Sequence, residues 1–324
     1  MFLNGIHHVT AVSSQIGRNV DFYTNLLGLR LVKKSVNQDD VSAYHLFYAD
    51  KVGSPGTDMT FFDWPHIGQN LRGTDTILAT AFRVNGHAAL EYWVKRFTEY
   101  GIAHNPIESF DGRSVVRFED PEGQQLMLVD DEDAIYAGEI WDGSDVPVAY
   151  AIRGFYAVLL SVPALDQIDP ILTQVLQFRQ GRNSQLPEVG EIVIYETGAG
   201  GPGRELWVVE EPDKPVARLG AGGVHHVAFR VADDAQHRDW REWILRTGLR
   251  VTPIIDRFYF RSIYFRISNG ILFEIATDGP GFAADEEPDK LGQKLALPPF
   301  LENQREQIEA GLKPINVPAA YSRV

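Results

Sequence analysis

Four short apolar segments of similar shape recur along the chain, and their recurrence is the main clue to the fold. Each is rich in apolar and β-branched residues, which is typical of a buried strand. Three of the four begin with glycine. The segments are 5–12, 77–84, 154–162 and 223–231. Repetition of this kind indicates one supersecondary unit that is used four times.

A segment with helical spacing follows each predicted strand. Apolar residues recur three and four positions apart, as at Val20, Tyr23 and Leu27. Glycine closes three of these segments, where a left-handed helix cap belongs, and glutamine takes its place in the third unit. The closing residues are Gly28, Gly101, Gln177 and Gly248. Counted from positions 8, 79, 157 and 226, they follow after 20 or 22 residues.

β-rich sequence completes each unit. The second unit ends in a predicted hairpin over 115–129, and the fourth ends in one that turns at 268–270. We therefore predict an α+β protein of four βαβββ modules, paired into two curved-sheet half-barrels. The predicted division is an N-terminal pair of modules at 1–131, a C-terminal pair at 149–279, and a tail at 280–324. Within the tail, a short helix is predicted over 301–311 after two prolines.

Composition narrows the function. The formal charge of −14 argues against nucleic acid and membrane surfaces as partners, because both favour basic proteins. The chain has no cysteine, which excludes thiolate metal ligands and a cysteine nucleophile. The N-terminal residues lack the features of a secretory signal, so we expect a cytoplasmic protein.

Two positions differ informatively among the aligned units. The first, on the opening strand, holds His8, Ala79, Ala157 and His226. The second, on the last strand, holds Thr60, Met127, Trp207 and Glu274, with the first and third units aligned through Gly56 and Gly203. A core strand rarely holds histidine and carboxylate at facing positions unless something binds them.

Two histidines and one carboxylate on separate strands form a facial triad, the set typical of non-haem Fe(II) oxygenases. Mn(II) would also fit. Either histidine alone could equally be a hydrogen-bonded structural residue, but the matching register of His8, His226 and Glu274 favours a metal site. Simple alternation predicts that His7 and His225 point to the opposite side of their strands. We interpret them as groups that support the ligands or lie at the edge of the pocket, with a purely structural role as the alternative.

Three more residues are placed relative to this triad. Thr10 shares a strand face with His8. A three-residue loop at the last hairpin would place Tyr264 across from Glu274, whereas a two-residue loop would place Phe265 there. The Tyr264 phenol would then either handle a proton or simply pack. Arg257 and Arg261 could neutralise a phenolate or lie at the surface. His45 could line the cavity of the first unit, but we interpret it as the one polar residue of an aromatic strand.

These residues resemble the vicinal-oxygen-chelate superfamily and, within it, the ring-cleaving dioxygenases that act on hydroquinones. The resemblance covers nearly the whole chain. Besides the histidine strands it rests on the segments 53–57, 61–65, 256–258, 264–274 and 297–302. The tail segment is the most specific mark of the subgroup.

The resemblance implies Fe(II) held by His8, His226 and Glu274, in a barrel shared by the first and fourth modules. It places five residues around the substrate: His7, Thr10, His225, Arg257 and Tyr264. The implied activity is extradiol-type cleavage of a hydroquinone- or catechol-type ring with O2. We also expect a homo-oligomer.

Two other functions stay open on the sequence. A glyoxalase-like isomerase or lyase would place a fourth ligand, usually a carboxylate, where Thr60 falls, and Asp58 lies on the same strand face. A small-molecule-sequestering resistance protein is the alternative from outside catalysis. Such proteins are generally two-unit chains that dimerise, so four units with a single triad favour an enzyme.

Overall fold

The computed structural model describes residues 1–267 and 270–315. Each of the four units has a strand, a helix and then three strands. The first contains β1 Ile6–Ser13, α1 Ile16–Asp21, β2 Arg30–Asn37, β3 Asp40–Ala49 and β4 Asp58–Asp63. The second contains β5 Thr76–Val84, α2 His87–Glu99, β6 Glu108–Phe110, β7 Arg113–Glu119 and β8 Gln125–Asp130.

The other two units repeat this order. The third contains β9 Phe155–Val162, α3 Leu165–Pro170, β10 Arg179–Leu186, β11 Gly190–Glu196 and β12 Glu205–Glu210. The fourth contains β13 Val224–Val231, α4 Asp234–Arg246, β14 Ile255–Asp256, β15 Arg261–Arg266 and β16 Leu272–Thr277. The four-module prediction is therefore confirmed.

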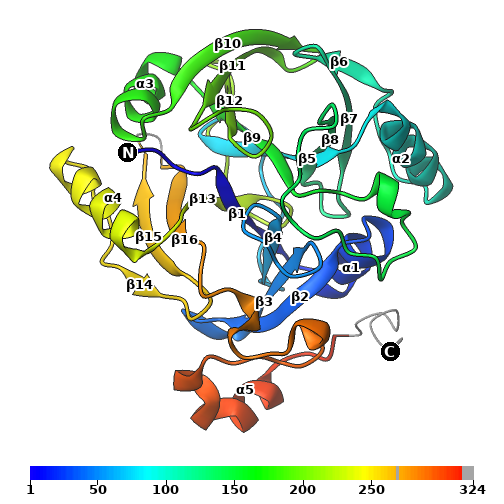
Figure 1. The fold of residues 1–324 in the computed structure, drawn as a ribbon, viewed down its shortest axis with the longest axis vertical. Coiled ribbons are helices and arrows are strands. Elements are labelled where there is room, and N and C mark those ends of the chain that lie inside the picture. The colour runs from blue at the N-terminus through cyan, green and yellow to red at the C-terminus, as the bar shows by residue number, and fades with distance from the viewer. Residues whose placement is uncertain (268–269, 316–324) are drawn as a thin grey trace.

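The modules form two curved eight-stranded sheets with the helices on the outside (Figure 1). The first and fourth units form the sheet β14-β15-β16-β13-β1-β4-β3-β2, and the second and third form β10-β11-β12-β9-β5-β8-β7-β6. In each sheet the two opening strands meet antiparallel at the centre, β1 with β13 and β5 with β9. Each sheet therefore combines one module from residues 1–131 with one module from residues 149–279.

The helix caps follow the repeat. Gly28, Gly101 and Gly248 have φ of 70°, 68° and 88°, and Gln177 has φ of 59° at the equivalent position. The helices themselves alternate in type. Those of the first and third units end in π-helical turns, Phe22–Leu26 and Ile171–Val175, whereas α2 and α4 are α-helical over 13 residues each. This alternation accompanies the two spacings, 20 and 22 residues, seen in the sequence.

The heads of two opening strands join the two sheets. Ile6 donates its backbone N–H to the carbonyl of Gly203, and Phe155 donates to that of Gly56, at 2.8 and 2.9 Å. A Cβ on Gly5 would lie 2.5 Å from the Gly203 oxygen. Glycine is therefore required there by close backbone approach as well as by its φ of 117°.

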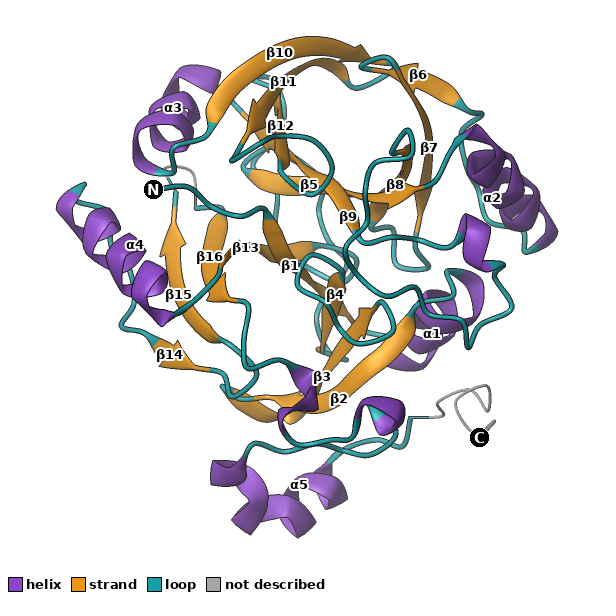
Figure 2. Ribbon diagram, viewed as in Figure 1, coloured by secondary structure: helices purple, strands orange, loops and turns teal. Residues whose placement is uncertain are grey.

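The tail packs outside the first sheet, along β2 (Figure 2). It contains short 3₁₀ turns and then α5 Arg305–Gly311. The helix predicted over 301–311 is found, although its first part is a 3₁₀ turn, Pro299–Gln304. Leu297, Leu301 and Ile308 pack on Val36 of β2. None of the helices in the described ranges has the length and apolar character needed to cross a bilayer. The cytoplasmic location and the homo-oligomer stay predictions.

A buried lysine anchors the start of the tail. Lys33 is fully buried, and its ammonium group binds the carboxylates of Asp285 and Glu286 and the carbonyl of Phe282. Replacing Lys33 with alanine leaves two partly buried acids without their cation. We expect the free energy of unfolding to fall by about 2–3 kcal/mol, below the usual cost for fully buried pairs.

Urea denaturation of Lys33→Ala measures this loss. The matched control is Lys294→Ala, because Lys294 lies in the same tail region but is exposed. Equal midpoints for the wild type and Lys33→Ala would contradict an anchoring role.

Candidate metal centre and active-site cavity

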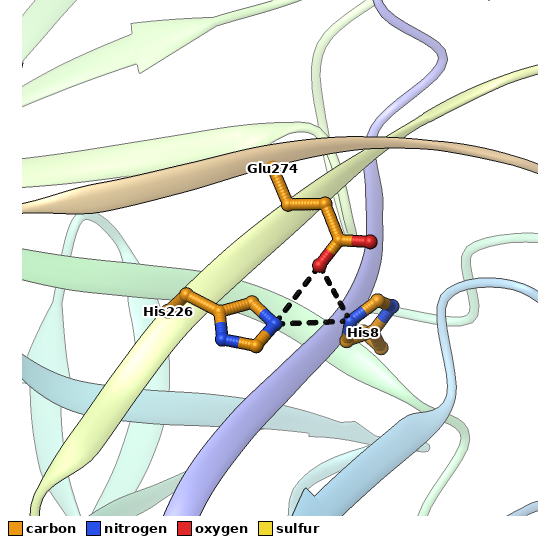
Figure 3. Close-up of side chains that lie close together, drawn as sticks. All are labelled: His8, His226 and Glu274. Atoms are coloured by element: carbon orange, nitrogen blue, oxygen red, sulfur yellow. Dashed lines mark hydrogen bonds and ion pairs between the residues drawn. The ribbon is translucent and has the colours of Figure 1, made fainter. Parts of the chain in front are cut away.

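Three strands of the first sheet bring His8, His226 and Glu274 together (Figure 3). Their side chains come from β1, β13 and β16, and all three residues are buried. The Nε2 atoms of the histidines are 3.3 Å apart. The Glu274 Oε2 atom lies 3.2 Å from Nε2 of His8 and 2.9 Å from Nε2 of His226. The structure therefore assembles the predicted triad.

The three donor atoms are spaced as ligands of one ion would be. Ligand atoms about 2.1 Å from a metal and at right angles to one another are about 3 Å apart. The three separations, 2.9, 3.2 and 3.3 Å, fall around this value. A carboxylate and two imidazoles also form the donor set suited to a divalent transition metal. The residues fit such an ion.

Strand register confirms the alignment of the units. Glu274 is in register with Ala228 on the neighbouring opening strand, two residues after His226. Thr60 pairs with Thr10, two residues after His8, in the same parallel geometry. Met127 and Trp207 occupy the equivalent places in the second sheet, opposite Ala81 and Leu159. Of the four equivalent positions, only that of the fourth unit carries a carboxylate.

Asp58 does not join the triad. It is in register with His8 and lies two residues before Thr60 on the same strand. Both of its carboxylate oxygens are buried without a hydrogen-bond partner among the described residues. Burial, together with Asp50, raises the pKa of Asp58 well above its usual value, despite the opposing effect of Arg230. Asp58 therefore does not occupy the position equivalent to Glu274, where a fourth ligand would stand.

The prediction that His7 and His225 point away from the triad is wrong. Register breaks at both residues, so each is the extra residue of a β-bulge. A bulge interrupts side-chain alternation, because two residues then oppose one on the partner strand. The Nδ1 atoms of His7 and His8 are 2.9 Å apart, and those of His225 and His226 are 2.7 Å apart.

The bulge belongs to the fold rather than to the metal site. The second sheet has the same register breaks between β5 and β9, at Leu78 and Tyr156. Those positions are equivalent to His7 and His225, yet Leu78 and Tyr156 have no histidine beside them. The shared fold therefore supplies the paired geometry, and the histidines of the first sheet make use of it.

The bulged histidines orient their neighbours. Nε2 of His7 lies 3.2 Å from the carbonyl oxygen of Thr277, which can only accept, so this nitrogen donates. Nδ1 of His7 is then an acceptor for Nδ1–H of His8. That leaves the Nε2 lone pair of His8 directed at the triad, as a metal ligand requires.

Burial keeps the imidazoles of His7, His225 and His226 neutral. It lowers the pKa of His7 well below its usual value, lowers that of His225 to about 3, and lowers that of His226. Burial would raise the pKa of Glu274, but contact with His8 and His226 holds it well below the usual range. The site therefore offers a neutral imidazole at His226 and an ionised carboxylate at Glu274, the forms that bind cations.

The structure confirms the predicted place of Tyr264. It is in register with Glu274 across the β15–β16 hairpin. Ser268 and Asn269 of the turn lie outside the described residues, but Ile267 and Ile271 pair on either side of it, as a three-residue loop requires. Burial and the nearby Glu274 raise the pKa of the Tyr264 phenol. The group is therefore a neutral hydrogen-bond donor rather than a phenolate.

Arg257 and Arg261 have different surroundings. Nε of Arg257 donates to the Tyr264 hydroxyl oxygen at 3.3 Å, and its other nitrogens bind Asp39 at 2.9 and 3.2 Å. Arg257 thus joins the hairpin to the β2–β3 turn. Arg261 is exposed and pairs with Asp234, so it lies at the surface.

A cavity opens beside the triad, and most of its wall was not predictable from the sequence. Two neighbouring parts of the first unit contribute: the end of β2 with its following turn, and the aromatic faces of β3 and β4. The lining residues are His8, Ser35, Val36, Asn37, Gln38, Asp39, His45, Phe47, Phe62, His226, Arg257, Tyr259, Phe260 and Tyr264. Phe260 lies against both His7 and His8, with ring centres 5.1 Å apart in each case.

His45 lines this cavity, which was the less favoured of its two interpretations from the sequence. Its Nε2 atom lies 3.0 Å from the Thr60 hydroxyl, and it packs between Phe47 and Phe62. Thr10 is buried, and its hydroxyl lies 3.1 Å from Nε2 of His226. The period-two alternation of β3 placed His45 on an aromatic face, but nothing local showed that this face lines the cavity.

Comparisons of sequence place the chain among known proteins. Residues 5–128 match the model of the glyoxalase/bleomycin resistance protein/dioxygenase superfamily. MhqA of Bacillus subtilis, named as a presumed ring-cleaving dioxygenase, is 46% identical over 97% of this chain and 100% of its own. The chlorohydroquinone/hydroquinone 1,2-dioxygenase of Sphingobium indicum is 30% identical over 94% of this chain and 95% of its own.

Comparisons of structure agree. The crystal structure of a presumed dioxygenase from Bacillus subtilis is 38% identical, with a TM-score of 0.87 over 98% of this chain and 99% of its own. Glyoxalase I from Zea mays is 13% identical, with a TM-score of 0.60 over 85% of this chain and 92% of its own, and shows the fold alone. The chain therefore belongs to the glyoxalase/bleomycin resistance protein/dioxygenase superfamily and, within it, to the family that contains these ring-cleaving dioxygenases.

Proposed function

We propose that the protein is an Fe(II)-dependent dioxygenase that cleaves the ring of a hydroquinone-type aromatic with O2. The observation that carries this proposal is the facial triad of His8, His226 and Glu274 at the wall of an aromatic-lined cavity. Fe(II) bound there would supply a redox-active centre with open positions for a ring oxygen and for O2. The name of the Sphingobium indicum relative supports the choice of hydroquinone.

The cavity suits a flat aromatic substrate. Phe47, Phe62 and Phe260 provide apolar ring surfaces beside the triad. Such surfaces bind an aromatic ring and keep water away from the reacting atoms. Polar side chains of the triad, of the β2–β3 turn and of the Arg257–Tyr264 region line the rest of the cavity, where they would orient the ring oxygens.

Two polar groups of the chain would handle the substrate oxygens. Tyr264 keeps its phenolic proton, so it donates a hydrogen bond or a proton to a ring oxygen. Arg257 holds that phenol in place and is itself held by Asp39. A ring hydroxyl that loses its proton gains a negative charge, which this guanidinium would stabilise.

The isomerase alternative is less well supported. It needs a second carboxylate at the position equivalent to Glu274, and that position holds Thr60. The similarity to glyoxalase I shows the fold alone. Mn(II) would fit the same donors, so the choice of iron rests on the proposed reaction.

Oxygen uptake tests the proposal. Protein purified without oxygen and loaded with one equivalent of Fe(II) is mixed with a panel of hydroquinones and catechols in an oxygen electrode cell. We expect one O2 consumed per substrate, with both oxygen atoms in a ring-opened acid. Conversion that needs no O2, or activity on a thiol adduct of a 2-oxoaldehyde, would support the isomerase instead.

A further inference from the structure

A chain of hydrogen bonds runs from the cavity wall to the triad. Nε2 of His45 lies 3.0 Å from the Thr60 hydroxyl oxygen. The Thr60 oxygen lies 2.8 Å from that of Thr10, which lies 3.1 Å from Nε2 of His226. These hydrogen bonds link four neighbouring strands, β3, β4, β1 and β13. The proposed metal ligands are His8, His226 and Glu274, so His45, Thr60 and Thr10 are not needed as ligands.

We propose that Thr60 and His45 are positioning residues that make the Thr10 hydroxyl donate a hydrogen bond to an oxygen atom of the substrate or O2 beside the triad. The proposal rests on the proposed function. It assigns a role to the position where a fourth ligand would otherwise stand.

The place of Thr60 in the sheet supports this role. Thr60 and Thr10 are both fully buried and in register, as Glu274 and Ala228 are in the fourth unit. The side chain of Thr60 therefore faces the same interior as Glu274. A hydroxyl at this position carries no charge, and its oxygen is already engaged by its two neighbours. It therefore directs another hydroxyl instead of binding an ion.

The direction of these hydrogen bonds is proposed to start at His45. Nε2–H of His45 donates to the Thr60 hydroxyl oxygen, and Thr60 in turn donates to the hydroxyl oxygen of Thr10. Nε2 of His226 lies 3.1 Å from the Thr10 oxygen and is a proposed metal ligand, so with a metal bound it would have no free lone pair to accept from Thr10. The Thr10 hydrogen would then be left to donate to an oxygen atom beside the triad.

His45 is suited to hold this direction. The rings of Phe47 and Phe62 pack against its imidazole and restrict its rotation. Their ring centres lie 4.0 and 4.5 Å from that of His45. Burial, with added effects from His8 and His226, lowers its pKa well below the usual value. The imidazole is therefore neutral, and the single N–H that it retains at Nε2 donates to Thr60.

Replacing Thr60 with valine tests the proposal, because it removes the hydroxyl and keeps the shape. We expect kcat to fall about 10–100-fold, as for other residues that act through a neighbour. KM and the Fe(II) affinity should change little. Thr60→Ser restores the hydroxyl and should restore kcat. The matched control is Thr80→Val in the second sheet, since Thr80 is equally buried and its hydroxyl has no hydrogen-bond partner among the described residues.

A second readout needs no metal and no turnover. The ¹⁵N resonances of the His45 ring in metal-free protein should show a protonated Nε2 that Thr60→Val perturbs and Thr60→Ser does not. Wild-type kcat in Thr60→Val, or unperturbed His45 resonances, would overturn the positioning role while the wild type still consumes O2. Loss of Fe(II) from Thr60→Val would overturn it too, by making Thr60 a ligand. A wild type that consumes no O2 with any substrate removes the proposed function as well.

Discussion

Replacing Glu274 with glutamine is expected to abolish Fe(II) binding and leave the protein folded. The amide keeps the shape of the side chain but removes the negative charge that faces His8 and His226. Loss of a residue that merely orients a ligand costs about 10–100-fold in metal affinity, and loss of a charged ligand should exceed that. Calorimetric titration of the metal-free protein with Fe(II) under argon measures the change.

The structure offers a matched control. Met127 occupies the position equivalent to Glu274 in the other sheet, where no histidine faces it. Met127→Leu conserves volume and should leave Fe(II) affinity and turnover unchanged. Circular dichroism of both variants checks the fold, which the apolar cores should maintain without a metal. A Glu274→Gln protein that still binds one equivalent of Fe(II) tightly would refute the ligand assignment.

Replacing Tyr264 with phenylalanine should lower kcat by about 10²–10⁴-fold, the usual contribution of a general acid–base group. The phenol lies across from Glu274 and keeps its proton because burial raises its pKa. Phenylalanine keeps the ring packing, so Fe(II) content and substrate affinity measured without O2 should change little. Stopped-flow measurement of ring opening under excess O2 gives kcat directly.

Tyr156→Phe is the control for this change. Tyr156 is a buried tyrosine of the second sheet whose hydroxyl has no hydrogen-bond partner among the described residues. Losing that hydroxyl removes no contact near the triad, so kcat should stay at the wild-type value. If Tyr264→Phe also kept the wild-type kcat, the phenol would have only a packing role.

Much of the fold followed from local chemistry. The four units could be recognised because each needs an apolar strand, an amphipathic helix and a left-handed cap. Gln177 was identified as a cap from its place in the repeat alone, and its φ of 59° confirms it. The register of Tyr264 with Glu274 was predictable for the same reason, because a hairpin loop sets the pairing of its own two strands.

The triad was also predictable, since it is the difference between repeated units. His8, His226 and Glu274 stand where the other units have alanine, methionine, tryptophan or threonine. A comparison within one chain therefore showed which strand positions carry chemistry. It needed only the assumption that equivalent positions of equivalent units face equivalent interiors, which the strand registers bear out.

Tertiary structure alone decided the rest. His7 and His225 turn toward the triad because pairing between β1 and β13 creates a bulge at each, and strand pairing over more than 200 residues leaves no trace in local alternation. Likewise, the cavity wall combines the β2–β3 turn, the Arg257–Phe260 segment and the face that carries His45. These parts meet because the sheet curves, and curvature depends on all of its strands together rather than on any one of them.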